Sequence, residues 1–361
     1  MDYARFSPMQ LRQVMGKWVI DLSNAAYGKI PQVVAPGEAH QWAGVQYSVG
    51  NPAAAFVKGS SSYIKYGEHP NRAGFEGDTP ITLSADRLPT DYRPLPIGES
   101  DDPHRIEALE NYAQVCANEW GQRANRETVG KIFDPTGKAI FSITGGVGNL
   151  DELATFDDAV QALRRELNTR KFYIYKAVTG ASLEGWVSRG SLLAFRKLLE
   201  VTGILGRETA GATTRLNPGF RGTDEQLVDL LAAELMMDKI HIEDIPVVSQ
   251  AFDRLPGDQV LSLVDQTAGS MVIALQDRQA STYDMRYGIE GLYPRFGFVT
   301  VGNSSGFTPR LLNDVDAKGQ AESLWCEKNF NVVDVTEQLR VKYSDFPQPL
   351  VVTDIAGVPT V

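Results

Sequence analysis

One run of apolar residues, spaced three and four positions apart, constrains the fold of this chain more than any other feature. It follows Ser100-Asp101-Asp102-Pro103, a typical helix start with a capping side chain, first-turn acids and an early proline. The apolar positions are Ile106, Leu109, Ala113, Cys116, Ala117, Trp120 and Ala124. This spacing predicts an amphipathic helix over residues 101–128, roughly seven turns long, with Ile106, Leu109 and Trp120 in the protein core.

The segment before this helix, residues 51–99, shows no helical periodicity. Prolines and glycines interrupt it throughout, and only 62–66 and 80–83 have the aromatic and β-branched composition of short strands. A compact domain rarely contains an excursion of about fifty residues without regular structure. We therefore expect an extended β loop that packs on other copies of the chain. Excision of residues 59–98 is expected to leave a folded chain that cannot assemble.

Composition excludes several classes of protein. The 361 residues carry a net charge of −10, which argues against a surface built to neutralise nucleic-acid phosphates. If the protein formed the wall of a container, its acidic surface would instead repel enclosed DNA and let it slide. No apolar run reaches the ~18 residues of a membrane span, and the first residues lack the pattern of a signal peptide. Two cysteines, Cys116 and Cys326, cannot form a disulfide framework.

The remaining sequence predicts an α+β fold. Residues 129–133 and 139–143 are expected to form a hairpin, and 171–178 alternates in the manner of a strand. Helices are predicted from about Thr155, over 186–199 and over 224–237. Further strands are predicted at 239–245, 260–264, 270–276, 297–301, 330–335 and 350–353. If the last strand pairs with 139–143 and 172–178, the unit between them is an insertion.

The residues that carry chemistry form no recognisable site. Four histidines, His40, His69, His104 and His241, stand at no metal-ligand spacing. The glycine cluster 145–149 lacks the ending of a phosphate-binding loop. We therefore predict no catalytic, cofactor-binding or metal-binding residues, and no enzymatic activity. A cytosolic α/β enzyme remains an alternative, which a small, stable monomer or dimer in solution would favour.

Arginine and aromatic side chains in the irregular segments are the candidates for contacts between subunits, because these residue types are enriched at the centres of interfaces. The predicted intersubunit contact residues are Tyr63, Tyr66, Arg72, Phe75, Arg286, Tyr293 and Arg295. Ordinary surface loops are the competing interpretation of each of these residues.

The order of these elements resembles the major capsid protein of tailed bacteriophages, the Hong Kong 97-like fold that encapsulin compartments share. The amino-acid sequence from Leu231-Ala232-Ala233-Glu234-Leu235 to residues 239–244 also resembles a helix and strand of phage coat proteins. The resemblance implies an N-terminal arm (1–50), an extended loop (51–99) and a spine helix (101–128). It further implies a peripheral domain (100–180 and 310–361) with an inserted axial α/β domain (181–309).

The resemblance implies a self-assembling structural protein that forms the icosahedral capsid of a virion, built from hexamers and pentamers and enclosing double-stranded DNA without sequence-specific binding. A separate scaffolding protein, a portal and a possible decoration protein are the implied partners, and assembly would occur in the bacterial host cytoplasm. Because strand-like residues 17–20 follow Met1 so closely, we expect the uncut chain to assemble. An encapsulin-like shell with a protein cargo is the alternative.

Overall fold

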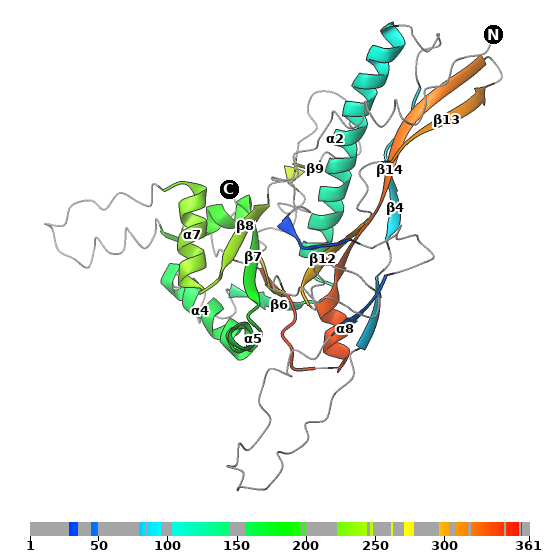
Figure 1. Ribbon diagram of the computed structural model, residues 1–361. Coiled ribbons are helices and arrows are strands. Elements are labelled where there is room, and N and C mark those ends of the chain that lie inside the picture. The colour runs from blue at the N-terminus through cyan, green and yellow to red at the C-terminus, as the bar shows by residue number, and fades with distance from the viewer. Residues whose placement is uncertain are drawn as a thin grey trace, which may run out of the picture.

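The protein combines helices and β-sheets in a mixed α and β architecture (Figure 1). The computed structural model describes residues 29–34, 45–49, 79–83, 85–94, 103–143, 156–196, 198–199, 222–243, 246–247, 261–262, 271–277, 296–302, 308–316, 319–342, 344–353 and 355. Its helices include α2 (Pro103–Phe133), α4 (Phe156–Thr169), α5 (Phe172–Thr179), α7 (Asp224–Glu234) and α8 (Val335–Lys342). Residues 189–196 and 198–199 are also helical.

A long strand, β14 (Gly319–Asp334), organises a six-stranded sheet. Its 16 residues extend over about 53 Å. One edge of β14 pairs with β12 (Phe298–Gly302) and β13 (Thr308–Asp316), and the other edge with β4 (Asp86–Pro89) and β5 (Arg93–Pro94). Strand β1 (Gln32–Val34) is added in parallel to β12. Two strand pairs lie outside this sheet, β2 (Val45–Val49) with β3 (Thr79–Leu83) and β9 (Pro246–Val247) with β10 (Leu261–Ser262).

A second sheet joins strands that are far apart in the sequence. Its order is β6 (Ala139–Ser142), β15 (Leu350–Thr353), β11 (Met271–Gln276), β7 (Ser182–Ser188) and β8 (Lys239–Glu243). The outer pairs β6–β15 and β7–β8 are parallel, whereas β11 is antiparallel to both of its neighbours. The predicted pairing of the C-terminal strand with 139–143 is therefore confirmed, whereas its predicted pairing with 172–178 is wrong, because these residues form α5 and the other neighbour of β15 is β11. The strands of the middle segment continue the same sheet.

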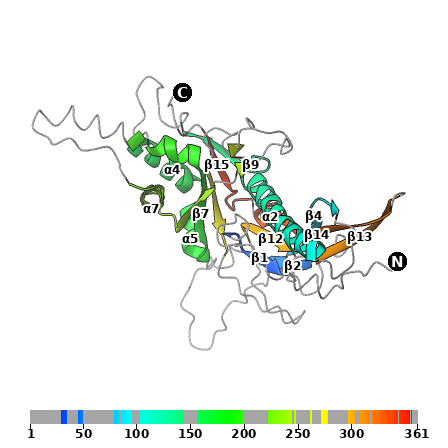
Figure 2. The same ribbon diagram turned by 90° about the horizontal axis from the view of Figure 1, so that it is seen from above.

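Both faces of this second sheet are covered, which explains why its central strand is apolar from Met271 to Leu275. Met271, Ile273 and Leu275 of β11 face the cluster formed with α4, α5, α7 and residues 189–199. The alternate residues Val272 and Ala274 face the cluster around α2. Because side chains alternate between the two faces of a strand, a strand buried on both sides reads as a continuous hydrophobic run. Figure 2 shows α2 on one side of β7 and β15, and α4, α5 and α7 on the other.

The long helix α2 forms with the predicted apolar face. Leu109 and Trp120 are each 1% exposed and pack with residues of β12, β14 and the five-stranded sheet. The side chain of Ile106 lies outside the described residues. The helix extends over 31 residues, about 46 Å, and ends at Phe133 rather than near residue 128. The predicted strand at 129–133 is wrong, because Val129, Ile132 and Phe133 continue the buried face of the helix.

The predicted strand at 171–178 is also wrong, since these residues include helix α5. Phe172 and Tyr175, three positions apart, are buried on the helical period, and Tyr173 donates a hydrogen bond to the Leu235 carbonyl at 2.9 Å. A short run of alternating aromatic and aliphatic residues fits either period, and here packing against α4 and α7 selects the helix.

The helix expected over 186–199 begins later than predicted. Trp186 belongs to β7, where it is fully buried, and the helical residues start at 189. The Ser188 hydroxyl accepts a hydrogen bond from the Ser191 N–H at 3.0 Å, which is the geometry of an N-cap. The helix predicted over 224–237 is confirmed as α7, and the strand predictions at 239–245, 270–276, 297–301 and 350–353 correspond to β8, β11, β12 and β15.

Candidate functional site

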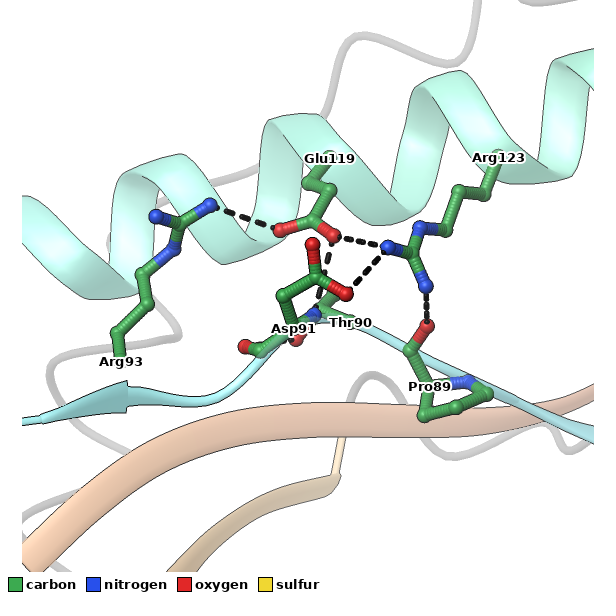
Figure 3. Close-up of polar contacts among 6 residues, drawn as sticks. All are labelled: Pro89, Thr90, Asp91, Arg93, Glu119 and Arg123. Carbon is green, nitrogen blue, oxygen red and sulfur yellow. Dashed lines mark hydrogen bonds and ion pairs between the residues drawn. The ribbon is translucent and has the colours of Figure 1, made fainter. Parts of the chain in front are cut away.

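The polar contacts best suited to a positioning role join residues 86–94 to helix α2. Strand β4, residues 90–92 and strand β5 form this segment, which we call the loop base (residues 86–94). Both strands pair with β14, through Lys328↔Leu88 and Leu324↔Arg93 among other pairs. Figure 3 shows residues 89–93 of the loop base alongside α2, with the Asp91 and Arg93 side chains directed toward Glu119 and Arg123 of the helix.

Glu119 of α2 is the centre of this site. Its Oε1 accepts the backbone N–H of Asp91 at 3.0 Å and also pairs with Arg123 Nη2 at 2.6 Å. Its Oε2 pairs with Arg93 Nη2 at 2.9 Å. The Glu119 side chain is only 16% exposed, so one partly buried carboxylate joins the helix to the turn between β4 and β5 and to the first residue of β5.

Arg123, one helical turn after Glu119, makes the second set of contacts. Its Nη1 donates to the Pro89 carbonyl at 2.7 Å, and its Nη2 lies 2.7 Å from Asp91 Oδ1. The Asp91 side chain is 74% exposed, and an isolated pair of this kind contributes only about 0–1 kcal/mol. The fork of the guanidinium nevertheless fixes direction, because it holds a backbone carbonyl and a carboxylate at the same time. We conclude that the cluster orients the loop base more than it stabilises the fold.

An exposed aromatic residue lies inside the loop base. Tyr92 is 56% exposed, and its ring packs against Trp325 of β14 with centroids 5.3 Å apart. Thr90, two positions before Tyr92, is buried. Because Tyr and Trp are enriched where protein surfaces meet, Tyr92 is the described aromatic residue best placed for contact with another molecule.

All seven predicted contact residues, Tyr63, Tyr66, Arg72, Phe75, Arg286, Tyr293 and Arg295, lie outside the described residues. Sequence reasoning did not identify Asp91, Tyr92, Arg93, Glu119 or Arg123. A signal was present, since Glu119 and Arg123 stand four apart on the polar face of a predicted helix and favour an ion pair. The contacts with Asp91 and Arg93 bridge 26 or more positions and have no local signature.

Within the part of the chain that the structure describes, no group of three or more His, Cys, Asp or Glu side chains could hold a metal ion. None of the described helices is long and apolar enough to cross a membrane. Of the four histidines, His104 is exposed at the start of α2, as predicted, and His241 is buried on β8. The ion pairs of the loop base consist of charges that neutralise one another, an arrangement suited to positioning a segment.

No protein-family model matches the sequence, and no curated protein matches it. Among solved structures, the chain is similar to a phage-related protein of Bordetella bronchiseptica, with 14% identity and a TM-score of 0.50 over 98% of this chain and 99% of that one. It is also similar to the capsid of a native GTA particle, with 13% identity and a TM-score of 0.42 over 92% of this chain and 97% of that one. An encapsulin complex of Synechococcus elongatus has 14% identity and a TM-score of 0.39, with 99% of this chain and 95% of that one covered.

The structural neighbours thus include capsid and shell proteins. At 14% identity, the similarity to the Bordetella protein shows a common fold.

Proposed function

We propose that this chain is the structural subunit of a protein shell, and in finer terms the major capsid protein of a tailed phage with the Hong Kong 97-like fold. In this proposal copies assemble as hexamers and pentamers into the icosahedral capsid of a virion and enclose double-stranded DNA. The mixed α and β fold common to this chain and the Bordetella protein supports the proposal, and the description of that protein as phage-related agrees with it.

The observation that carries the proposal is the anchoring of the loop base on α2. A segment that reaches a neighbouring subunit transmits force only if its base is rigid. Here Glu119 and Arg123 hold Asp91, Arg93 and the Pro89 carbonyl against a 31-residue helix. Strand pairing with β14 holds the same segment from its other side. Residues 51–78 would then extend from this base over an adjacent subunit and add strands to it.

The same proposal assigns a structural role to each segment of the chain. Residues 1–50 form the arm, 51–99 the extended loop, 100–180 with 310–361 the peripheral domain around the spine helix, and 181–309 the axial domain. The many copies in a shell make modest contacts sufficient, because stability then arises from multivalency. A scaffolding protein and a portal complete the proposed assembly in the host cytoplasm, and a decoration protein is a further proposed partner.

Expression of the full chain, followed by sedimentation and negative-stain electron microscopy, tests the proposal. Closed particles of uniform size are the expected result. A stable monomer or dimer at high protein concentration would contradict a shell and favour an enzyme. Particles purified from the native source distinguish the finer alternatives, since a phage capsid contains double-stranded DNA and an encapsulin contains a protein cargo.

A matched pair of variants tests the loop base itself. Glu119→Gln keeps the size of the side chain but removes the charge that holds Arg93 and Arg123. Glu127→Gln makes the same charge change at an exposed position of α2. We expect both variants to be folded by circular dichroism, and only Glu119→Gln to give fewer or irregular particles. If Glu119→Gln assembles as the parent does, the loop base does not position the loop.

The structure also changes the design of the loop deletion. Leu83 and Ala85 are buried in the large core cluster, so excision of residues 59–98 would remove core residues as well as the strands β3, β4 and β5. A deletion confined to residues 59–78 keeps the loop base. We expect this shorter deletion to leave a folded chain that does not form shells, and regular shells from it would contradict the proposed role of the loop.

A further inference from the structure

Residues 29–34, which we call the strap, connect the six-stranded and the five-stranded sheets. Strand β1 within the strap pairs in parallel with β12, with Gln32 opposite Thr300. The Thr300 N–H donates to the Pro31 carbonyl at 3.0 Å. Ile30 is 2% exposed and packs in the cluster around α2. In Figure 1 the strap is the blue strand beside β12.

The first residue of the strap pairs with a buried charge on the other sheet. Lys29 Nζ lies 3.1 Å from Glu243 Oε1 and donates to the Ile242 carbonyl at 3.0 Å. The Glu243 side chain is only 1% exposed, whereas that of Lys29 is 21% exposed. Glu243 is the last residue of β8, at the edge of the five-stranded sheet. The strap therefore makes a polar contact with β8 and a backbone contact with β12.

A second buried acidic group lies on the same face of the sheet. His241 Nε2 and Glu184 Oε2 form a hydrogen bond at 2.9 Å, and both side chains are at most 4% exposed. His241 stands opposite Trp186 in the register of β7 and β8, and the two rings stack with centroids 5.7 Å apart. This face of the β7–β8 pair thus carries two buried carboxylates, one with an imidazole partner from within the sheet and one with an ammonium partner from the strap.

Burial makes the contact between Lys29 and Glu243 asymmetric. Removal from water raises the pKa of the Glu243 carboxyl, and the neighbouring Lys29 opposes this rise, with a smaller contribution from His241. An ion in a protein interior without a partner is strongly unfavourable, so Glu243 depends on its partner. Lys29 is partly exposed and would be solvated readily if the strap left. The ion pair therefore stabilises buried Glu243 of the five-stranded sheet more than it stabilises Lys29, although the strap supplies the cation.

We infer that the strap is a detachable element locked by the Lys29–Glu243 ion pair, which latches it to the five-stranded sheet. Three backbone pairs with β12 and the side chain of Ile30 complete its attachment. When the latch opens, the backbone edge of β12 and the apolar site of Ile30 become accessible. The inference concerns the isolated chain and does not depend on the proposed function.

Hydrogen–deuterium exchange on the unassembled full chain tests this inference in the peptides that contain residues 29–34 and 298–302. Lys29→Met removes the latch cation, and Lys239→Met is the matched control, because Lys239 is exposed at the other end of β8. We expect exchange in both peptides to accelerate about tenfold or more in Lys29→Met and to stay unchanged in Lys239→Met.

The double variant Lys29→Met with Glu243→Gln separates a latch from general damage. With both charges absent, no carboxylate is left unpaired but the ion pair is still missing, so exchange in both peptides should remain faster than in the parent and should not exceed that of Lys29→Met. Lys29→Met with parental exchange would overturn the inference, as would a double variant that regains the protection of the parent. If Lys29→Met fails to fold, the folded double variant takes its place: faster exchange than in the parent supports the latch, and parental exchange, or a double variant that also fails to fold, contradicts it.

Discussion

The ring of Trp120 in α2 meets the ring of Phe330 in β14 edge to face, with centroids 5.7 Å apart and an interplanar angle of 83°. Both residues belong to the cluster that joins the long helix to the two sheets. Edge-to-face aromatic pairs add about 0.5–1.5 kcal/mol beyond the area that they bury. This contact therefore attaches the midpoint of the helix to the longest strand of the described structure.

Trp120→Ala should lower the free energy of unfolding by about 3–5 kcal/mol, because it removes a fully buried indole and leaves a cavity beneath the helix. Urea denaturation of the unassembled chain, followed by circular dichroism, measures the change. Val115→Ala, on the same helix but 43% exposed, is the control and should stay within about 0.5 kcal/mol of the parent. Equal stability of the Trp120→Ala variant and the parent would show that α2 is not packed at this point.

Gly297 and Gly137 share a left-handed backbone but differ in the space around them, with φ of 95° and 74°. A Cβ at Gly297 would lie 2.1 Å from Gln276 Oε1 and 2.7 Å from the Leu275 carbonyl oxygen, whereas a Cβ at Gly137 would meet nothing closer than 4.0 Å. Gly137→Ala should cost about 1–2 kcal/mol from backbone strain alone. Gly297→Ala should cost about 2–5 kcal/mol, because overpacking adds to that strain. Thermal unfolding compares them, and equal losses would contradict the steric argument.

Met236 is a non-glycine residue at the left-handed position that ends α7, with φ of 51°. The Met236 and Met237 N–H groups donate to the Ala233 and Ala232 carbonyls at 3.2 and 2.8 Å, which is a Schellman motif, where glycine is the usual residue. The Met236 side chain is 55% exposed. Met236→Gly should therefore raise the free energy of unfolding by about 0.5–1 kcal/mol. Met236→Ala keeps the strained backbone and should give no gain in the same denaturation experiment.

Asp334, where β14 meets α8, should make stability depend on pH. Burial raises the pKa of its carboxyl to about 6, although the Thr336 N–H at 3.0 Å and the nearby Lys138 lower it. The folded state then binds the proton more tightly than the unfolded state, in which the pKa is about 4. The stabilisation from this protonation is complete below pH ~4 and is lost as the pH rises through ~6.

Asp334→Asn should therefore gain stability relative to the parent as the pH rises. The asparagine oxygen can still accept the Thr336 N–H, so the start of α8 is kept. Between pH 4 and pH 7 the difference in free energy of unfolding should move by about 2–3 kcal/mol in favour of the variant. Denaturation curves at several pH values measure it. A difference that does not change with pH would show that Asp334 titrates normally.

Hydrophobic periodicity predicted the elements in which apolar residues recur at the spacing of the helix or strand that they form. The face of α2 with Leu109, Ala113, Cys116 and Trp120 is buried as its spacing predicts, and the apolar run of β11 is a strand covered on both sides. Hydrophobic periodicity failed where a short apolar run fits both the helical and the strand spacing. The residues of α5 read equally well as a strand, and only the packing of Phe172 and Tyr175 against the neighbouring elements decides between the two.

The residues of the candidate site, in contrast, were not identified from the sequence. The sequence directed attention to arginine and aromatic residues of the irregular segments, and those predictions remain predictions. Glu119 and Arg123 were visible only as a helical charge pair. Their partners Asp91 and Arg93 lie on another element, and an ionic contact between distant positions leaves no periodic trace in a single sequence.

By itself, the sequence determined the long amphipathic helix and the buried strands, because hydrophobic spacing acts locally. Tertiary structure alone decided which strands share a sheet, where the loop base meets Glu119, and how Lys29 reaches Glu243. These relationships depend on burial and charge compensation between segments that meet only after the chain has folded. Lys29 and Glu243 are 214 positions apart, and their contact exists only because two sheets bring them together.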